Sequence, residues 1–396
     1  MFLTEQTERT AEYNSLISDI IIRENSHNPL TVPLFCAIIQ GKQNGGKEMR
    51  AFNYSAIKER KWDSDILGLI AAIYKEAGKQ ELYLKQRPQE LEKLVEIAKI
   101  QSTEASNAIE GIVTTNTRIR QLVEEKTAPK NRDEQEIAGY RDVLNIIHND
   151  FDAIPITQNY ILQFHKIMYS HMNNPVAGRT KTVQNYISAT YPDGHTEILF
   201  TPLSPFETPA ALDKICEEYN RVIGNMELEP LIAIPIFIHD FLCIHPFNDG
   251  NGRMSRLLTT LLLYQNGFFV GKYISLEAKI AKNKDLYYDA LAQSQNGWYE
   301  GTEDVLPFIK YLLGTILAAY KDLDERVALV ETKLPALEMV RRASENKIGR
   351  FNKQDIRELC PTLSDSSIEC ALRKLVADGE LKKEGKGKNT CYFRLK

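Results

Sequence analysis

Apolar residues at helical spacing dominate the chain, and short polar or glycine-rich stretches separate the segments that carry them. Helical patterns cover residues 56–77, 88–110, 137–147, 157–170, 231–243, 257–264 and 305–323. In these segments the apolar side chains recur every three or four positions or fill the segment, as in helices that face or lie within a core. The first helix contains Trp62 and is expected to end at Gly78. The second begins at Pro88, which suits a first helical turn.

Residues 173–205 break this pattern and are rich in Gly, Pro, Thr and Tyr. Tyr191-Pro-Asp-Gly-His195 is a turn signal between two β-prone runs. The second run, Thr196–Phe200, is expected to be the returning strand of a hairpin. The pattern therefore predicts a mainly α fold, a helical bundle with one β-hairpin.

The C-terminal residues differ from the rest in charge and in element order. Residues 335–396 carry 14 Lys+Arg and 9 Asp+Glu, a net charge of +5, whereas residues 1–334 carry 35 and 44, a net charge of −9. Helices at about 335–346, 353–359 and 364–378 precede two strands within 381–395. This order resembles a winged helix-turn-helix, an α+β module with the third helix in the recognition position. Asp365 and Glu369 on that helix disfavour contact with phosphate, so DNA binding is a weaker interpretation than protein docking or homodimer formation.

Bulk composition limits the class of protein without naming a function. A chain of 396 residues with 43% hydrophobic and 26% charged residues is expected to form two or three soluble globular domains. The six cysteines form no C-x-x-C pair, which favours reduced thiols of a cytosolic protein over a disulfide framework or a zinc site. We see no signal-peptide pattern and no long apolar run, so we expect a cytoplasmic protein without a membrane partner.

The densest chemistry lies in the loop between the apolar runs 231–243 and 257–264, which reads His245-Pro-Phe-Asn-Asp-Gly-Asn-Gly-Arg-Met-Ser-Arg256. The helix that contains residues 257–264 is expected to start near Asn251. A helix start with glycines beside it binds phosphate readily. Arg253 and Arg256, three positions apart on that helix, share a face and could clamp one polyphosphate. Asp249 suits Mg²⁺, and His245 can exchange a proton near neutral pH.

This stretch matches the Fic-domain signature H-P-F-x-[DE]-G-N-G-R-x-x-R at every specified position, and the chain thus resembles a Fic protein adenylyltransferase. The resemblance implies transfer of AMP from ATP to a Tyr, Ser or Thr hydroxyl of a target protein, with His245 as general base and Asp249 as the Mg²⁺ ligand. It implies phosphate binding by the amides of Gly250, Asn251 and Gly252 and by the guanidinium groups of Arg253 and Arg256. Phe247 would be a core anchor. Gly250 and Arg253 favour nucleotidyl transfer over the phosphate transfer of some relatives.

A second family feature lies at the end of the 88–110 helix. Ser106-x-x-x-Glu110-Gly111 resembles the inhibitory motif [ST]-x-x-x-E-[GN] of Fic proteins. A carboxylate brought to the phosphate-binding arginines would compete with the γ-phosphate, and we expect Glu110 to pair with Arg256. The resemblance is to the class whose inhibitory helix precedes the Fic core in the same chain.

The resemblance also implies which residues bind the target segment and which bind adenosine. The hairpin would be a flap that docks the target segment by main-chain pairing through Thr196, Glu197, Ile198, Leu199 and Phe200. Tyr287 and Tyr288 would line the adenosine pocket, and Gln295 stands where relatives often have Asn.

These features divide the chain into an N-terminal region with the inhibitory helix (1–112), a Fic core (113–325) and a winged-helix module (335–396). Two other functions remain compatible with the sequence: removal of AMP from a modified target with the help of Glu110, and DNA-binding regulation by a nucleotide-sensing Fic core. Self-modification is a further expectation of the transferase interpretation.

Overall fold

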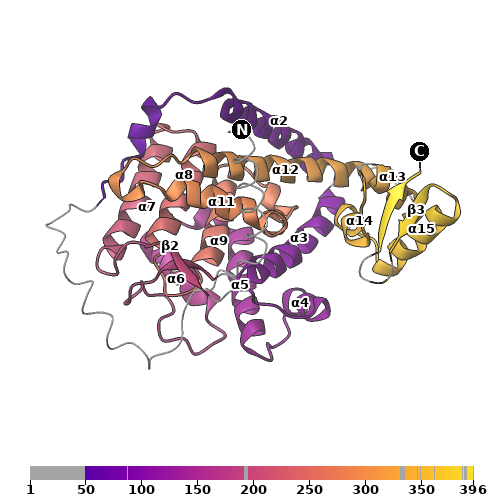
Figure 1. Cartoon of the computed structure of the whole chain (residues 1–396), viewed down its shortest axis with the longest axis horizontal. Coiled ribbons are helices and arrows are strands. Elements are labelled where there is room, and N and C mark those ends of the chain that lie inside the picture. The colour runs from indigo at the N-terminus through magenta and orange to yellow at the C-terminus, as the bar shows by residue number, and fades with distance from the viewer. Residues whose placement is uncertain are drawn as a thin grey trace, which may run out of the picture.

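The computed structural model describes residues 50–395 apart from 87, 191–194, 331–334, 346, 348, 361, 386, 388 and 389. The first 49 residues of the expected N-terminal region (1–112) lie outside these residues, as does most of the hairpin turn Tyr191-Pro-Asp-Gly-His195. The described part is mainly helical, with two small antiparallel sheets, which confirms the predicted fold class (Figure 1).

The helices form a layered body around α8 and α9, which carry the loop of interest between them (Figure 1). Every residue from Leu231 to Ile244 of α8 is buried, because the helix is apolar on all sides and lies within the core. The helices of the body are α2 (Ser64–Gln86), α3 (Pro88–Ile109), α4 (Asn116–Val123), α5 (Arg132–Asp150), α6 (Gln158–Met168), α7 (Thr208–Gly224), α8 (Pro230–Ile244), α9 (Asn251–Gln265), α10 (Leu276–Lys282), α11 (Lys284–Gln295) and α12 (Leu306–Val330).

The segment expected to be one helix from 56 to 77 is two elements. A 3₁₀ turn η2 (Tyr54–Glu59) ends at Arg60, and α2 starts at Ser64 and continues through Gly78 to Gln86. The break is made by Asp63, whose Oδ1 accepts a hydrogen bond from Ile66 N at 3.0 Å and so caps the start of α2. The prediction of an unbroken helix ending at Gly78 was therefore wrong. Trp62 lies in the break and packs, partly buried, against the core.

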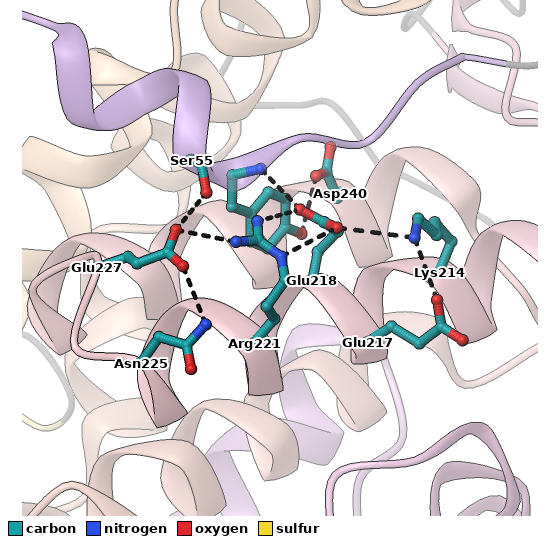
Figure 2. A network of polar contacts seen from close by, with 9 residues as sticks. Ser55, Lys214, Glu217, Glu218, Arg221, Asn225, Glu227 and Asp240 are labelled. Carbon is teal, nitrogen blue, oxygen red and sulfur yellow. Dashed lines mark hydrogen bonds and ion pairs between the residues drawn. The ribbon is translucent and has the colours of Figure 1, made fainter.

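Turn η2 is fastened to α7 and α8 by a network of polar contacts (Figure 2). Tyr54 donates from its backbone N to Glu218 at 3.1 Å and from its hydroxyl to Asp240 at 2.9 Å. Ser55 Oγ donates to Glu227, which also pairs with Arg221 of α7. This region shares one hydrophobic core with the rest of the helical body, from Phe52 and Tyr54 onward.

The predicted hairpin is present as strands β1 (Ile187–Thr190) and β2 (Thr196–Phe200). They pair antiparallel, with Ser188 opposite Ile198 and Thr190 opposite Thr196. Strand β2 lies on the viewer's side of the helical body in Figure 1 and contacts α11. The remaining 3₁₀ turns of the body are η3 (Phe151–Ala153), η4 (Val270–Lys272) and η5 (Trp298–Glu300).

The C-terminal residues form a smaller unit beside the helical body, past the end of α12 (Figure 1). Its hydrophobic cluster is separate from the main core and centres on Val340, Ile356, Ile368 and Leu372. Three helices precede a two-stranded sheet, the element order expected of a winged helix-turn-helix, although that assignment stays a prediction. The elements are α13 (Ala336–Glu345), α14 (Lys353–Leu359), α15 (Asp365–Ala377), β3 (Leu381–Glu384) and β4 (Cys391–Arg394).

Candidate active site

The loop from α8 to α9 makes two sharp changes of backbone direction. His245 caps the end of α8 in a left-handed conformation with φ 51°, and Gly250 precedes α9 in the same region with φ 85°. A side chain on Gly250 would meet Met168 Cε at 2.7 Å and the Tyr169 hydroxyl at 2.9 Å, so glycine is required there on both counts. The loop therefore has one defined path, with the first amides of α9 facing the site.

His245 is buried, and its ring is held by the end of its own helix. Its Nδ1 lies 3.3 Å from Leu242 O, so a proton on Nδ1 donates to that carbonyl and Nε2 is then the basic nitrogen. Burial, aided by the positive charge of Lys181, lowers the pKa of His245 to about 4. The ring is therefore neutral at pH 7 and able to accept a proton.

His245 opens onto a cavity of about 700 Å³ that collects much of the predicted site. The cavity is large enough for a nucleotide-sized ligand. The predicted residues that line it are Glu110, Leu199, Phe200, His245, Gly252, Arg256, Tyr287 and Tyr288. Tyr186, Leu242, Leu291, Trp298 and Tyr299 also line it, and their types gave no signal in the sequence because aromatic and aliphatic residues of this kind usually belong to cores.

The end of α3 reaches the part of this cavity that Gly252 and Arg256 line. Glu110 Oε1 lies 2.7 Å from Arg256 Nη2. Ser106 holds the same guanidinium, because Arg256 Nε donates to Ser106 Oγ at 2.8 Å and Nη2 donates to Ser106 O at 2.9 Å. A Cβ on Gly252 would overlap Glu110 Oε1, so the carboxylate lies directly against the first turn of α9. It occupies the position that an anion at this helix start would take.

Arg253 and Arg256 do not converge on one ligand in this conformation, which differs from the expected shared clamp. Arg253 is 1% exposed and pairs with Glu136 of α5 at 2.8 Å, and its Nη2 also donates to the Tyr169 hydroxyl at 2.8 Å. Because these partners lie on α5 and after α6, Arg253 turns away from the cavity while Arg256 lines it. Burial and the neighbouring Glu136 fix Arg253 within the core.

Asp249 also lies outside the lining of the cavity. Its carboxylate is 30% exposed and lies 3.6 Å from Arg253 Nη2. Among the described residues, no group of three or more His, Cys, Asp or Glu is placed to hold a metal ion. One accessible carboxylate does fit Mg²⁺ that is held mainly by phosphate and water oxygens.

The side chains of His165 and Asn251 also shape the loop. His165 stacks on Phe247 at 3.8 Å between ring centroids, accepts from Gly178 N at 2.9 Å, and so donates from Nε2 to Asp249 O at 3.0 Å. The Asn251 side chain accepts from Phe247 N and donates to Phe247 O, both at 2.8 Å. These contacts fix the loop between His245 and α9.

Two further predicted sets of residues lie on α11 and on the hairpin, two elements that contact each other. Tyr287 is buried on α11, packs against Tyr288 at 5.2 Å between ring centroids, and both line the cavity. On the flap, Leu199 and Phe200 line the cavity, whereas Thr196, Glu197 and Ile198 lie along the exposed strand β2 outside the lining.

Comparisons with known proteins identify the family of the segment that carries this loop. Residues 155–263 match the Fic/DOC family. The chain is 27% identical over 217 residues to "Protein adenylyltransferase Fic" of Nematostella vectensis, a match that covers 52% of this chain and 44% of that protein. It is 26% identical over 260 residues to the protein of the same name from Drosophila yakuba, covering 62% and 47%. The chain thus spans about half the length of these curated relatives.

Solved structures extend the likeness of fold beyond the matched segment. A Fic family protein from Desulfovibrio desulfuricans G20 superposes with a TM-score of 0.56 at 20% identity, covering 85% of this chain and 97% of that one. Fic-1 from Caenorhabditis elegans gives 0.50 at 22% identity, covering 64% and 69%. Residues 155–263 thus form a Fic domain, as residues 245–256 predicted.

Proposed function

We propose that this protein transfers AMP from ATP to a hydroxyl side chain of a target protein. The observation that carries the proposal is one cavity whose lining includes His245, Arg256, Gly252 in the first turn of α9, Tyr287, and Leu199 and Phe200 of the flap. The names of the curated relatives, protein adenylyltransferases, support the same chemistry.

Each part of the cavity has a role in such a reaction. His245 Nε2 accepts the proton of the target hydroxyl as its oxygen bonds to the α-phosphorus, and the bond to the β-phosphate oxygen breaks to release pyrophosphate. A positioned base contributes on the order of 10²–10⁴-fold to a rate. Arg256 and the first amides of α9 stabilise the phosphate charge. Tyr287 and Tyr288 offer apolar faces to adenine.

We further propose that Asp249 holds Mg²⁺ when ATP is bound. Its carboxylate is partly exposed at the turn before α9, so it can reach a cation shared with phosphate oxygens. The ion would neutralise phosphate charge during transfer.

Glu110 keeps the described conformation inactive in this proposal. Its carboxylate neutralises Arg256 and lies against the helix start, where the terminal phosphates of ATP would bind. Displacing Glu110 is therefore a condition for productive ATP binding.

The test is incorporation of labelled AMP by Glu110→Ala, with Glu104→Ala as the matched control. Glu104 is also an acidic residue of α3, but it does not line the cavity. We expect Glu110→Ala alone to raise incorporation, by about tenfold or more, because removing the carboxylate frees Arg256 for phosphate and a hydrogen bond between charged groups is worth about 1.5–3 kcal/mol. Adding His245→Ala should abolish it. Equal labelling of wild type and Glu110→Ala would contradict the inhibitory role, and labelling that survives His245→Ala would contradict the assignment of the base.

A further inference from the structure

Lys181, on the segment before the flap, contacts the end of α8 twice. Its ammonium Nζ donates to Ile244 O at 2.9 Å, and its backbone N donates to Pro246 O at 2.7 Å. The side chain is 2% exposed and does not line the cavity. Lys181 therefore donates hydrogen bonds to the carbonyls before and after that of His245, and it does not border the cavity.

Asn185 donates hydrogen bonds to two more carbonyls of this stretch, those of His245 and Phe247. Its Nδ2 donates to His245 O at 3.3 Å and to Phe247 O at 2.9 Å. Its Oδ1 accepts from Lys181 Nζ at 2.9 Å, so the two side chains act as one unit. Four consecutive carbonyls, from Ile244 to Phe247, thus receive hydrogen bonds from the segment 181–185.

This segment leads directly into strand β1 of the flap, which begins at Ile187. The other limb of the flap is tied to the same place, because Gln184 Nε2 donates to Pro202 O at 2.9 Å and Leu203 N donates to Cys243 O at 3.4 Å. The base of the flap and the loop that carries His245 are therefore one hydrogen-bonded unit.

A lysine suits this position for electrostatic reasons. The carbonyls at the end of α8 carry the negative end of the helix dipole, which favours a cation there. Burial nevertheless lowers the pKa of Lys181 to about 7, so the amine is held at a cost and is not merely a solvated surface charge.

We propose that Lys181 and Asn185 are positioning residues, which hold His245 in its left-handed backbone conformation and fix it relative to the flap strand that receives the target. The proposal rests on the proposed function for its meaning in catalysis. It adds that the position of His245 relative to the target depends on residues 181–185 at the base of the flap, which donate hydrogen bonds to the carbonyls of residues 244–247. The helices α8 and α9 alone do not fix that position.

Hydrogen exchange tests the positioning directly and does not depend on activity. In Lys181→Met and Asn185→Asp we expect the amides of residues 247–251 to exchange about tenfold faster or more, as for the loss of one buried hydrogen bond. Asn185→Asp keeps the oxygen that accepts from Lys181 but loses both donors to the loop. Lys214→Met, a surface lysine of α7 paired with Glu217 at 3.1 Å, is the control and should exchange like wild type. Wild-type exchange of the loop in Asn185→Asp overturns the proposal, even if Lys181→Met fails to fold.

Kinetics in the Glu110→Ala background tests the consequence for catalysis. Both substitutions should lower kcat by about tenfold to a hundredfold, as expected for a small misplacement of a reacting group, and change KM for ATP by less than about twofold. Lys181→Arg should restore part of kcat, because it can still donate to Ile244 O. A rise in KM with kcat unchanged overturns the proposal. Absence of AMP transfer by Glu110→Ala itself contradicts the proposed function, and the exchange experiment still decides the positioning.

Discussion

Left-handed backbone conformations at His245 and Gly250 mark the two ends of the loop that carries the proposed base. Histidine reaches this region at a cost that glycine does not have, and the surrounding contacts must stabilise it. Packing and hydrogen bonds therefore hold the loop in a conformation that His245 would not prefer by itself. Phe247 of the loop is buried, and its backbone N donates to the side chain of Asn251.

At Gly250 this constraint leads to a stability prediction. Gly250→Ala should lower the free energy of unfolding by about 2–3 kcal/mol, because alanine is strained at φ 85° and its Cβ would meet Met168 and Tyr169. Chemical denaturation measures the change. Gly224→Ala, at the end of α7 with open space around the added Cβ, is the control and should be neutral or slightly stabilising. Equal stabilities of the two variants would show that the loop adapts.

A second residue-scale prediction concerns pH and Asp240, which is buried among Tyr54, Trp298 and Arg50. Burial raises the pKa of Asp240 to about 6, although Arg50 and the two hydrogen bonds act in the opposite direction. The native state then holds a proton that the unfolded chain releases near pH 4, so this carboxyl makes the protein less stable as pH rises from about 4 to 6.

Asp240→Asn should remove that dependence. The difference in unfolding free energy between variant and wild type should change in favour of the variant by about 3 kcal/mol between pH 4 and 6, and stay constant above pH 7. Denaturation at several pH values measures it. A difference that does not vary with pH would mean that Arg50 keeps Asp240 ionised throughout.

At the scale of elements, the end of α3 determines where the carboxylate of Glu110 lies. Gly111 follows Glu110 with φ 78° and ends the helix, which turns the chain towards α4. The motif around Ser106 and Glu110 was readable in the sequence because its residues are close in the chain. The break at Asp63 was also readable, as an Asp-Ser start signal, but the regular apolar spacing around it concealed the signal.

Gly111→Ala should partly relieve the proposed inhibition. Alanine is disfavoured by about 1 kcal/mol or more in this left-handed conformation, so the end of α3 should shift and weaken the contact of Glu110 with Arg256. Incorporation of labelled AMP should fall between that of wild type and Glu110→Ala. Gly379→Ala, with φ 75° and equally open surroundings after α15, carries the same strain far from the cavity and should label like wild type. If both glycine variants label equally, the end of α3 does not control access.

The contacts that surround His245 show where prediction from sequence stops. The loop could be identified because its chemistry lies in consecutive residues. Lys181, Asn185 and His165 contact it from about sixty to eighty positions away, and lysine, asparagine and histidine are common in many settings. Their roles depend on how helices pack, which the apolar pattern does not specify. Likewise, the spacing of Arg253 and Arg256 predicts that both lie on one helix face. The ion pair with Glu136 nevertheless turns Arg253 away from the cavity.

At the scale of the whole molecule, charge is divided between a negative helical body and a positive C-terminal unit. Much of that positive charge is paired within the unit, which reduces what a phosphate backbone could contact. The ion pairs include Lys353 with Glu369, Arg357 with Asp365, Arg350 with Glu384, and Arg341 with Glu380. No helix among the described residues is both long and apolar enough to cross a membrane.

We therefore expect no binding of duplex DNA by the full chain, even at low salt. Release of counterions drives such binding and needs unpaired cations on one face. An electrophoretic mobility assay at about 50 mM salt measures it, a concentration at which phosphate contacts are strong. A shifted band that weakens steeply as salt is added would contradict this expectation and assign the unit to nucleic acid.

Glu110 and Arg256 lie in one polypeptide, and this has a consequence for how the proposed inhibition responds to its surroundings. A group tethered within the same chain faces its partner at a fixed effective concentration, typically in the millimolar range or above for short flexible tethers. Dilution cannot separate the pair, and a soluble competitor must overcome that local excess. Specific activity should then be the same at any protein concentration, and control would come from forces on α3 rather than from the abundance of the protein.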